Sequence, residues 1–419
     1  MPDPMLQPVH PRLKFTLNFD TGSDPGTNPG AGVIPGVEAW RLAIPAKPAC
    51  YLLCDANEQP ILLATTGNLR NAMVHRLAEG VSPREEERDL GNEGMRDDAS
   101  NGPASSPQSL SSPPQSLSSR TDYRAITRII QYRPCCSAFE TDWTFLENVR
   151  SIHPRNYRTL IRHWRTHWIT MDPGAAHPRF TPTTQPHFEG ELCIGPIAAS
   201  ADAKQTIDAL EDLCDLCRHH DILVQAPHGI ACAYKEMGKC PAPCDGSITM
   251  DEYRRRIDDA ISLLVPGNAP PGSKNRDDWI ARVRQQMKQA VAELRFEQAA
   301  RWKLKLERLA ALDHPSLRWC RPLDQWRGLY LQPGSRKSAL RPFIITPGRI
   351  RFLGEITGKH RDQQIAWLQS HLPTLLNDAT PPDELAAHRM ALFARHLMRD
   401  NAPGRWLPAD QPLEGIADF

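Results

Sequence analysis

The sequence has almost no net charge and no long apolar run. Its 50 Lys and Arg residues are balanced by 49 Asp and Glu residues, so no global field draws the chain to nucleic acid or to an anionic membrane. No apolar run approaches the roughly 18 residues of a membrane helix. Residues 1–20 lack a basic stretch followed by an apolar core. We therefore expect no membrane contact and a cytoplasmic location.

Stretches poor in apolar residues divide the chain, which points to a multi-domain α+β fold. The stretch that is poorest in apolar residues contains a duplicated Pro-Gln-Ser-Leu-Ser-Ser. Its composition predicts a disordered insertion at 81–120. The expected segments are an N-terminal extension (1–40), a module with a small mixed sheet and helices (41–170), a helical cysteine-rich region (190–265), a helical hairpin (275–313), and a small C-terminal antiparallel sheet with helices (319–419).

Local patterns predict the elements within these segments. Alternating or continuous apolar runs bounded by turn residues indicate strands, and apolar residues at i, i+3 and i+4 indicate helices. The predicted strands are 49–54, 61–64, 328–331 and 343–345, and the predicted helices are a helix capped by Asn68, 123–132, 139–149, 203–217, 250–264 and a helical pair in 277–312 that turns near Arg295.

Eleven cysteines in a chain expected to meet a reducing compartment favour metal binding over disulfides. Cys232, Cys240 and Cys244 lie close in the sequence with Pro and Gly between them, so their sulfurs can converge on one ion or cluster. Such a set suits a [4Fe-4S] cluster and also structural Zn²⁺. The candidates for a fourth ligand are Cys217, Cys214, His219 and His220.

The cysteine segment, with Ile194-Gly195-Pro196 before it and residues 247–253 after it, resembles the UvrC family, the excinucleases of bacterial nucleotide excision repair. The resemblance implies a protein of DNA repair that acts on damaged DNA. It also implies an iron-sulfur cluster held by four cysteines.

Three of the family's cluster ligands map to Cys232, Cys240 and Cys244. The family's first ligand aligns near His219, which is not a thiol. Cys217 is our candidate for that place.

The helical pair contains a second resemblance, because residues 294–300 are similar to the UVR motif that UvrB and UvrC proteins share. So short a hairpin cannot bury both apolar faces alone, so we expect an exposed stripe that pairs with another copy. The resemblance implies that this partner is UvrB. The residues expected to bind it are Leu294, Phe296, Glu297 and Ala300. The apolar positions predicted to form the inner faces are Met287, Ala290, Val291, Leu294, Phe296, Ala299, Ala300, Leu306 and Leu309.

The module at 41–170 resembles the GIY-YIG nuclease domain that begins UvrC proteins. Residues 48–51 and 61–65 stand where the family has its two tyrosine motifs, and residues 68–70 match its Asn-Leu-Arg. The resemblance implies catalytic roles for Tyr51, Arg70 and Glu147, with Glu147 holding one Mg²⁺ or Mn²⁺. Glu140 and Asp142 are alternative carboxylates.

The family's second tyrosine, the general base for the attacking water, is Leu62 in this chain. Loss of a general base typically lowers a rate roughly 10²- to 10⁴-fold. An active nuclease would then need Tyr51, His75 or a metal-bound hydroxide in its place.

A segment without acidic residues, at 148–171, is rich in arginine and aromatic residues. Guanidinium groups bind phosphates and flat rings stack on exposed bases, so the segment predicts DNA contact. The arginines that we expect to touch DNA are Arg155, Arg158, Arg162 and Arg165, and the interleaved rings are Tyr157, Trp164 and Trp168.

UvrC proteins also carry a nuclease domain of the RNase H type. Too few residues follow Asp313 to hold that domain together with the helix-hairpin-helix elements behind it, and no matching acidic strands are visible, so we expect this chain to lack it. We consider two main hypotheses for the function. The protein is a metal-dependent GIY-YIG endonuclease that incises damaged DNA, or it is a catalytically impaired adaptor that binds DNA and UvrB. A metal or redox sensor built on the cysteines is a third.

Overall fold

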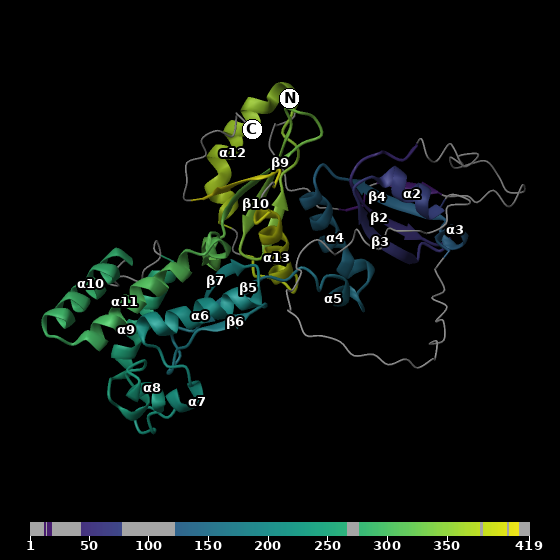
Figure 1. Ribbon diagram of the computed structural model, residues 1–419. Coiled ribbons are helices and arrows are strands. Elements are labelled where there is room, and N and C mark those ends of the chain that lie inside the picture. Colours follow the sequence, from purple (N-terminus) through teal and green to yellow (C-terminus); the bar gives the residue numbers. More distant parts are fainter. Residues whose placement is uncertain are drawn as a thin grey trace, which may run out of the picture. The chain divides into compact units, whose positions relative to one another are not determined.

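A computed structural model of the chain (Figure 1) describes residues 12–13, 15–18, 43–77, 122–265, 276–377, 380–399 and 402–409. These residues fall into two compact units, one up to His153 and one from Pro154 onward. Both contain helices and antiparallel sheet, so the predicted multi-domain α+β class is confirmed. The insertion predicted at 81–120 lies outside the described residues. No described helix is long and apolar enough to cross a membrane.

The first unit is built on a sheet with strand order β1-β4-β2-β3. The predicted strands 49–54 and 61–64 are confirmed and pair as a hairpin. Its turn is closed by Asp55, whose carboxylate accepts from the backbone amides of Asn57 and Gln59 at 2.8 Å each. Every described strand pair in this sheet is antiparallel, whereas we expected a mixed sheet. A short turn permits only antiparallel pairing. The strands are β1 (Phe15–Asn18), β2 (Ala49–Cys54), β3 (Pro60–Thr66) and β4 (Ile129–Pro134).

The helix predicted at 123–132 is wrong beyond its first turn. Helix α3 (Tyr123–Ile126) is one turn long, and β4 follows it. Strand β4 lies between β1 and β2, so both of its edges find backbone partners. That pairing outweighs the local helical spacing, because β propensity depends on the neighbours that a strand finds.

Helices α2 (Leu69–Leu77) and α4 (Ala138–Ile152) cover opposite faces of this sheet. Successive strand residues point to opposite faces, and Tyr51 packs with Met73 of α2 in one core. On the α4 side Glu140 is 0% exposed, and its carboxylate lies 3.6 Å from the guanidinium of Arg133. The α4 face therefore contains a buried ion pair.

The second unit begins with a sheet of strand order β6-β5-β7-β8, against which α6 packs. Gly195 lies in β7 beside Trp168, and a Cβ at Gly195 would come within 2.7 Å of that ring. Helix α6 ends at Cys214, because Asp215 adopts a left-handed backbone with φ of 56°. The elements are α5 (Tyr157–Leu160), β5 (His167–Met171), β6 (Thr181–Thr183), β7 (Leu192–Ile197), α6 (Ser200–Cys214), α9 (Met250–Leu264) and β8 (Arg321–Pro322).

The helical pair and the C-terminal sheet complete the second unit. The predicted helical hairpin is confirmed, and so is the antiparallel meander that follows it. The last strand, β12, returns to pair with β9 and was not predicted. The elements are α10 (Arg276–Ala292), α11 (Phe296–Arg308), β9 (Gly328–Pro333), β10 (Leu340–Thr346), β11 (Arg349–Phe352), α12 (Arg361–Leu376), α13 (Ala386–Leu397) and β12 (Arg405–Pro408).

Removal of one partner of the Arg133–Glu140 pair should destabilise the first unit strongly. Glu140→Gln leaves a buried guanidinium without its ion partner, and such changes typically cost about 3–5 kcal/mol. Hydrogen exchange of the β2 and β4 amides in the full chain measures the loss. Lys303→Ala is the control, because its pair with Glu307 is exposed and should matter by less than about 1 kcal/mol. If the β2 and β4 amides of Glu140→Gln exchanged at the wild-type rate, the buried Arg133–Glu140 pair would not stabilise this unit.

Candidate functional site

The cysteine-rich segment forms a small lobe, here called the cysteine lobe (219–248), with two short helices visible at the bottom of Figure 1. They are α7 (His220–Leu223) and α8 (Ala233–Glu236). Lys235 of α8 lies 2.5 Å from the carboxylate of Asp245, and the Ser247 hydroxyl donates to the same carboxylate at 2.6 Å. These hydrogen bonds lower the pKa of Asp245 to about 2. They fix the loop that carries the last cysteines.

Two of the predicted thiols, Cys217 and Cys240, are in contact, and Cys244 is near enough for its charge to affect Cys217. The Cys217 S–H has two acceptors in reach, the His219 carbonyl at 3.4 Å and the Cys240 sulfur. The hydrogen bond between the sulfurs lowers the pKa of Cys240 to about 7 and raises that of Cys217. Burial, then Asp245 and Cys240, raise the pKa of Cys244. The structure thus brings the Cys217 and Cys240 sulfurs into contact.

Cys232 is partly buried and immediately precedes α8. Within the described ranges, no group of three or more His, Cys, Asp or Glu side chains is arranged to hold a metal ion. The chemistry of the three neighbouring thiols fits a metal or cluster that takes thiolates. The described residues thus do not bring all four predicted ligands together.

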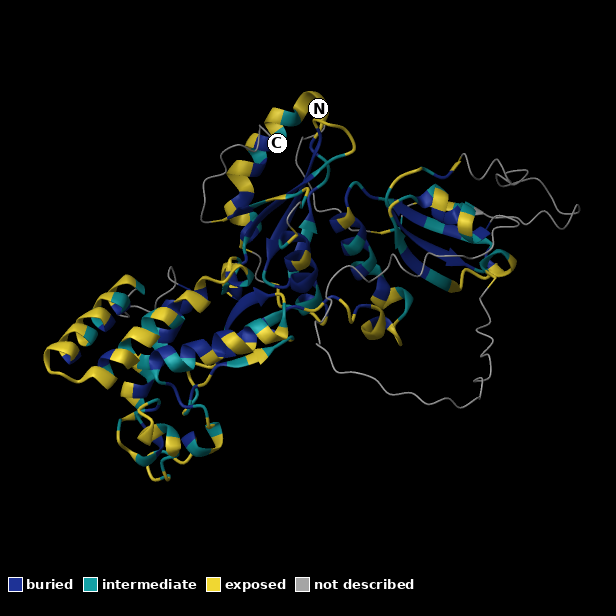
Figure 2. Cartoon of the chain, in the orientation of Figure 1, coloured by how far each residue is buried: buried dark blue, intermediate teal, exposed yellow. Residues whose placement is uncertain are grey.

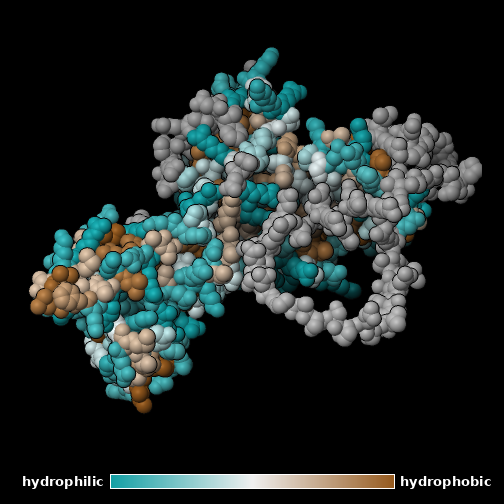
Figure 3. All heavy atoms as spheres, in the orientation of Figure 1, coloured by the Kyte–Doolittle hydropathy of each residue, from teal (hydrophilic) through white to brown (hydrophobic). Residues whose placement is uncertain are grey.

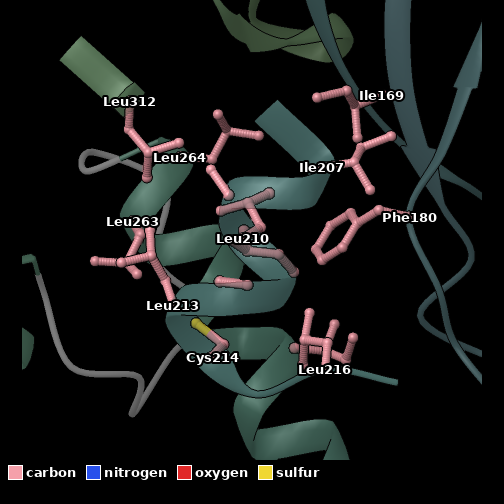
Figure 4. Packing of buried hydrophobic residues seen from close by; sticks show 14 of the residues in the cluster. Ile169, Phe180, Ile207, Leu210, Leu213, Cys214, Leu216, Leu263, Leu264 and Leu312 are labelled. Carbon is pink, nitrogen blue, oxygen red and sulfur yellow. The ribbon is translucent and has the colours of Figure 1, made fainter. Parts of the chain in front are cut away.

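The other candidates for the fourth ligand are engaged elsewhere. Cys214 points into the leucine-rich core shown in Figure 4, and burial raises its pKa. The His219 ring packs 5.6 Å from the Tyr234 ring. The Nε2 atom of His220 lies 3.3 Å from the His177 carbonyl oxygen.

The hairpin buries its base and exposes its tip (Figure 2). At the base, Trp279, Val283 and Leu309 join the same core cluster as Cys217 and Cys240. The predicted inner faces are therefore right for Ala290, Ala299 and Leu309 and wrong for four residues at or near the turn. Those residues are Val291 (48% exposed), Leu294 (73%), Phe296 (62%) and Ala300, which is also exposed.

The tip has a further unusual feature. Leu294 adopts a left-handed backbone, with φ of 60°, a conformation that a non-glycine residue adopts at a cost of about 1–2 kcal/mol. Its side chain is exposed, so no core packing offsets that strain. Apolar spheres gather over the hairpin at the left of Figure 3. The other two predicted partner-binding residues, Glu297 and Ala300, are also exposed.

The predicted DNA-contacting segment separates into two faces. Its arginines are exposed, whereas its rings are 8% exposed or less. The prediction that these rings stack on bases is therefore wrong, because they pack into the interior of the second unit. The exposed residues are Arg155, Arg158, Arg162 and Arg165, and the buried rings are Tyr157, Trp164 and Trp168.

Two of these arginines are close to α13. The Tyr157 hydroxyl donates to Glu384 at 2.6 Å and accepts from Arg158 Nε at 3.1 Å. Burial, then the charges of Arg165 and Arg158, lower the pKa of His388. The result is a locally basic surface on a chain with little net charge.

The structure does not gather the predicted nuclease residues. Tyr51 is 1% exposed and lies in the core under α2. Arg70 Nε donates to the Ile44 carbonyl at 2.9 Å. Glu147 is on α4, which covers the other face of the sheet. Glu140, the alternative ligand, is paired with Arg133.

Sequence reasoning missed a set of ion pairs between α6 and α11. Asp212 and Asp215 meet Lys305 and Arg308. Lys305 and Arg308 are three apart on α11, which is the spacing that places side chains on one face, and Asp212 and Asp215 are three apart at the end of α6, where Asp215 is the left-handed cap. The complementary charge at equal spacing was the available signal.

Two family models match this chain. The "UvrC/Cho excinuclease, middle domain" matches residues 166–263, and the "UvrB/uvrC motif" matches residues 279–312. The first match contains the cysteine lobe and α6, and the second contains the hairpin. No solved structure matches.

Curated relatives carry the name UvrABC system protein C. The one from Trichlorobacter lovleyi is 28% identical over 206 residues, which cover 47% of this chain and 32% of the relative. The one from Geobacter metallireducens is 28% identical over 181 residues, covering 42% and 28%. The chain thus spans about a third or less of the length of the relatives that it matches. The two family models and these relatives together identify it as a UvrC-like protein.

Proposed function

We propose that this protein is an adaptor in the excision repair of DNA, which binds a UvrB-type protein through its hairpin and DNA through its basic segment. The observation that carries the proposal is the exposed apolar tip. Leu294 and Phe296 are exposed, whereas most other apolar side chains among the described residues are buried. Isolated exposed apolar residues are common, but a cluster with a strained backbone indicates a binding surface.

The arrangement of the first unit favours an adaptor over a nuclease. A general base must reach the water that it activates. Leu62 cannot act as a base, and Tyr51 is buried beneath α2. Glu147 and Tyr51 belong to opposite sides of the sheet. A metal on Glu147 would supply charge stabilisation at a phosphate, but it would lie apart from that tyrosine.

Phe296→Ala with Leu294→Ala should weaken capture of a UvrB-type protein. Exposed aromatic and apolar anchors at an interface contribute about 2 kcal/mol or more, which is roughly thirty-fold in Kd. Surface plasmon resonance with the purified partner measures the Kd, and circular dichroism checks that the variant is folded. Lys303→Ala on the same helix is the matched control. Equal affinity of the double variant and the wild type would rule out docking through the tip.

Binding of DNA should occur without Mg²⁺-dependent cleavage. Because the rings are buried, contact should be to phosphates, so affinity falls with salt by a slope of about 0.9 per neutralised phosphate. Arg158→Ala with Arg162→Ala should reduce that slope by about 2 in fluorescence anisotropy, with the exposed Arg336→Ala as control.

The same samples are incubated with lesion-bearing duplex, Mg²⁺ or Mn²⁺, and the UvrB-type partner. Cleavage that disappears in Glu147→Gln would establish the nuclease hypothesis instead. An unchanged salt slope in the double arginine variant would exclude the basic segment as the DNA contact.

We also infer that Cys217, Cys232, Cys240 and Cys244 hold a [4Fe-4S] cluster or, alternatively, Zn²⁺. The contact between the Cys217 and Cys240 sulfurs supports the proposal, because thiolates that lie together are the ligands that such groups require. When bound, the group would cross-link the loops of a lobe that has little core of its own. Binding would require Cys232 to approach the other three.

Cys240→Ser should abolish metal retention after anaerobic purification. Elemental analysis for iron and zinc measures the metal content and distinguishes the [4Fe-4S] cluster from Zn²⁺. Cys320→Ser is the control, because Cys320 Sγ lies outside the lobe, 3.7 Å from the Pro196 carbonyl oxygen. Equal metal content in both variants would refute the assignment.

A further inference from the structure

The C-terminal turn of α6 is a junction between the hairpin and the cysteine lobe. From α11, Lys305 Nζ lies 2.7 Å from the Asp215 carboxylate and donates to the Leu213 carbonyl at 3.0 Å. Arg308, one turn further along α11, pairs with Asp212. Positive charge is favoured at a helix C-terminus, where carbonyl groups have no partner within the helix. Helix α11 therefore caps α6.

The same two aspartates are held from the other side by residues next to the thiols. Arg256 of α9 lies 3.2 Å from the Asp215 carboxylate and donates to the Cys214 carbonyl at 3.3 Å. Arg218, which directly follows Cys217, pairs with Asp212 and lies over the Tyr234 ring of α8 at 5.4 Å. Asp215 thus joins the hairpin to α9, and Asp212 joins it to the residue that follows Cys217.

The junction is partly withdrawn from solvent. The Lys305 side chain is 14% exposed, and those of Asp212 and Asp215 are 16% and 21% exposed. Ion pairs at such depth are screened less than surface pairs. The apolar core is also shared, because Leu309 at the end of α11 belongs to the same cluster as Cys217 and Cys240. Displacement of α11 would therefore disturb polar and apolar contacts around the thiols together.

We propose that the hairpin and the cysteine site are energetically coupled through this turn. Docked α11 holds Cys217 in position against Cys240, and a group bound by the thiols stabilises the docked hairpin. The coupling is reciprocal, because linkage requires equal effects in both directions. This inference rests on the proposed function for its biological meaning, but its geometry needs neither a bound metal nor a partner protein.

Alkylation of the full chain without metal tests the first direction. In Lys305→Ala with Arg308→Ala, iodoacetamide should label Cys217 and Cys240 about five-fold faster or more, the lower end of typical coupling. Peptide mass spectrometry reads each site. Cys193 and Cys320, outside the lobe, should keep their rates. Lys303→Ala, whose pair is exposed, should behave as the wild type, and Lys305→Arg with Arg308→Lys should restore slow labelling.

Unchanged rates at Cys217 and Cys240 in the double alanine variant overturn the coupling. Faster labelling at all four cysteines indicates general loosening, and the charge-preserving variant then decides: slow labelling restored there supports the junction, and fast labelling there overturns it.

Addition of Zn²⁺ alone tests the reverse direction. It should slow hydrogen exchange of the α11 amides in the wild type and not in Cys240→Ser. Elemental analysis of the same sample shows whether Zn²⁺ has bound. If no Zn²⁺ binds, the zinc alternative is refuted and the coupling rests on the labelling result, whereas bound Zn²⁺ without slower exchange would overturn the coupling, because linkage requires equal effects in both directions.

Discussion

The left-handed turn at Asp215 is the constraint on which the middle of this protein depends. It ends α6 one turn before Cys217, and it leaves the last carbonyls of the helix to be satisfied by cations from α9 and α11. Three segments far apart in the sequence therefore meet at one helix end. A hydrophobic cluster that runs from the β5–β7 sheet to Leu312 surrounds this meeting point.

That constraint explains how one short hairpin can be rigid at one end and available at the other. Its base is fixed by Trp279, Val283 and Leu309 and by the ion pairs of α11. The residues of its tip are not part of the core cluster, and Leu294 and Phe296 there are largely exposed. An anchored base lowers the entropy lost when the tip meets a partner, since the helices are already ordered.

Local signals predicted the elements whose stability is local. Helix α9 begins at its predicted residue because Thr249 and Glu252 form a capping box, a pattern confined to four residues. The hairpin was predicted for the same kind of reason, its 3.6-residue periodicity. Strand β4 was not, because its pairing with β1 joins residues more than a hundred positions apart.

The candidate site also depends on contacts between distant residues, which local sequence patterns do not reveal. Cys214 and Cys217 are three residues apart and both belong to the core cluster. Only the end of α6 between them decides that Cys217, and not Cys214, meets Cys240. Tyr157, Trp164 and Trp168 have the spacing of both a stacking platform and a buried face. Nothing within 148–171 reveals that all three are buried in the folded unit or that Tyr157 bonds to Glu384.

Hydrogen exchange along the hairpin of the isolated full chain tests the central claim most directly. An anchored base with a free tip predicts that amides at 279–283 and 305–309 exchange as slowly as those of α6, while amides at 291–296 exchange many times faster. A hairpin that exchanges uniformly fast from base to tip would contradict this account, because it would show that α11 is not held at the end of α6.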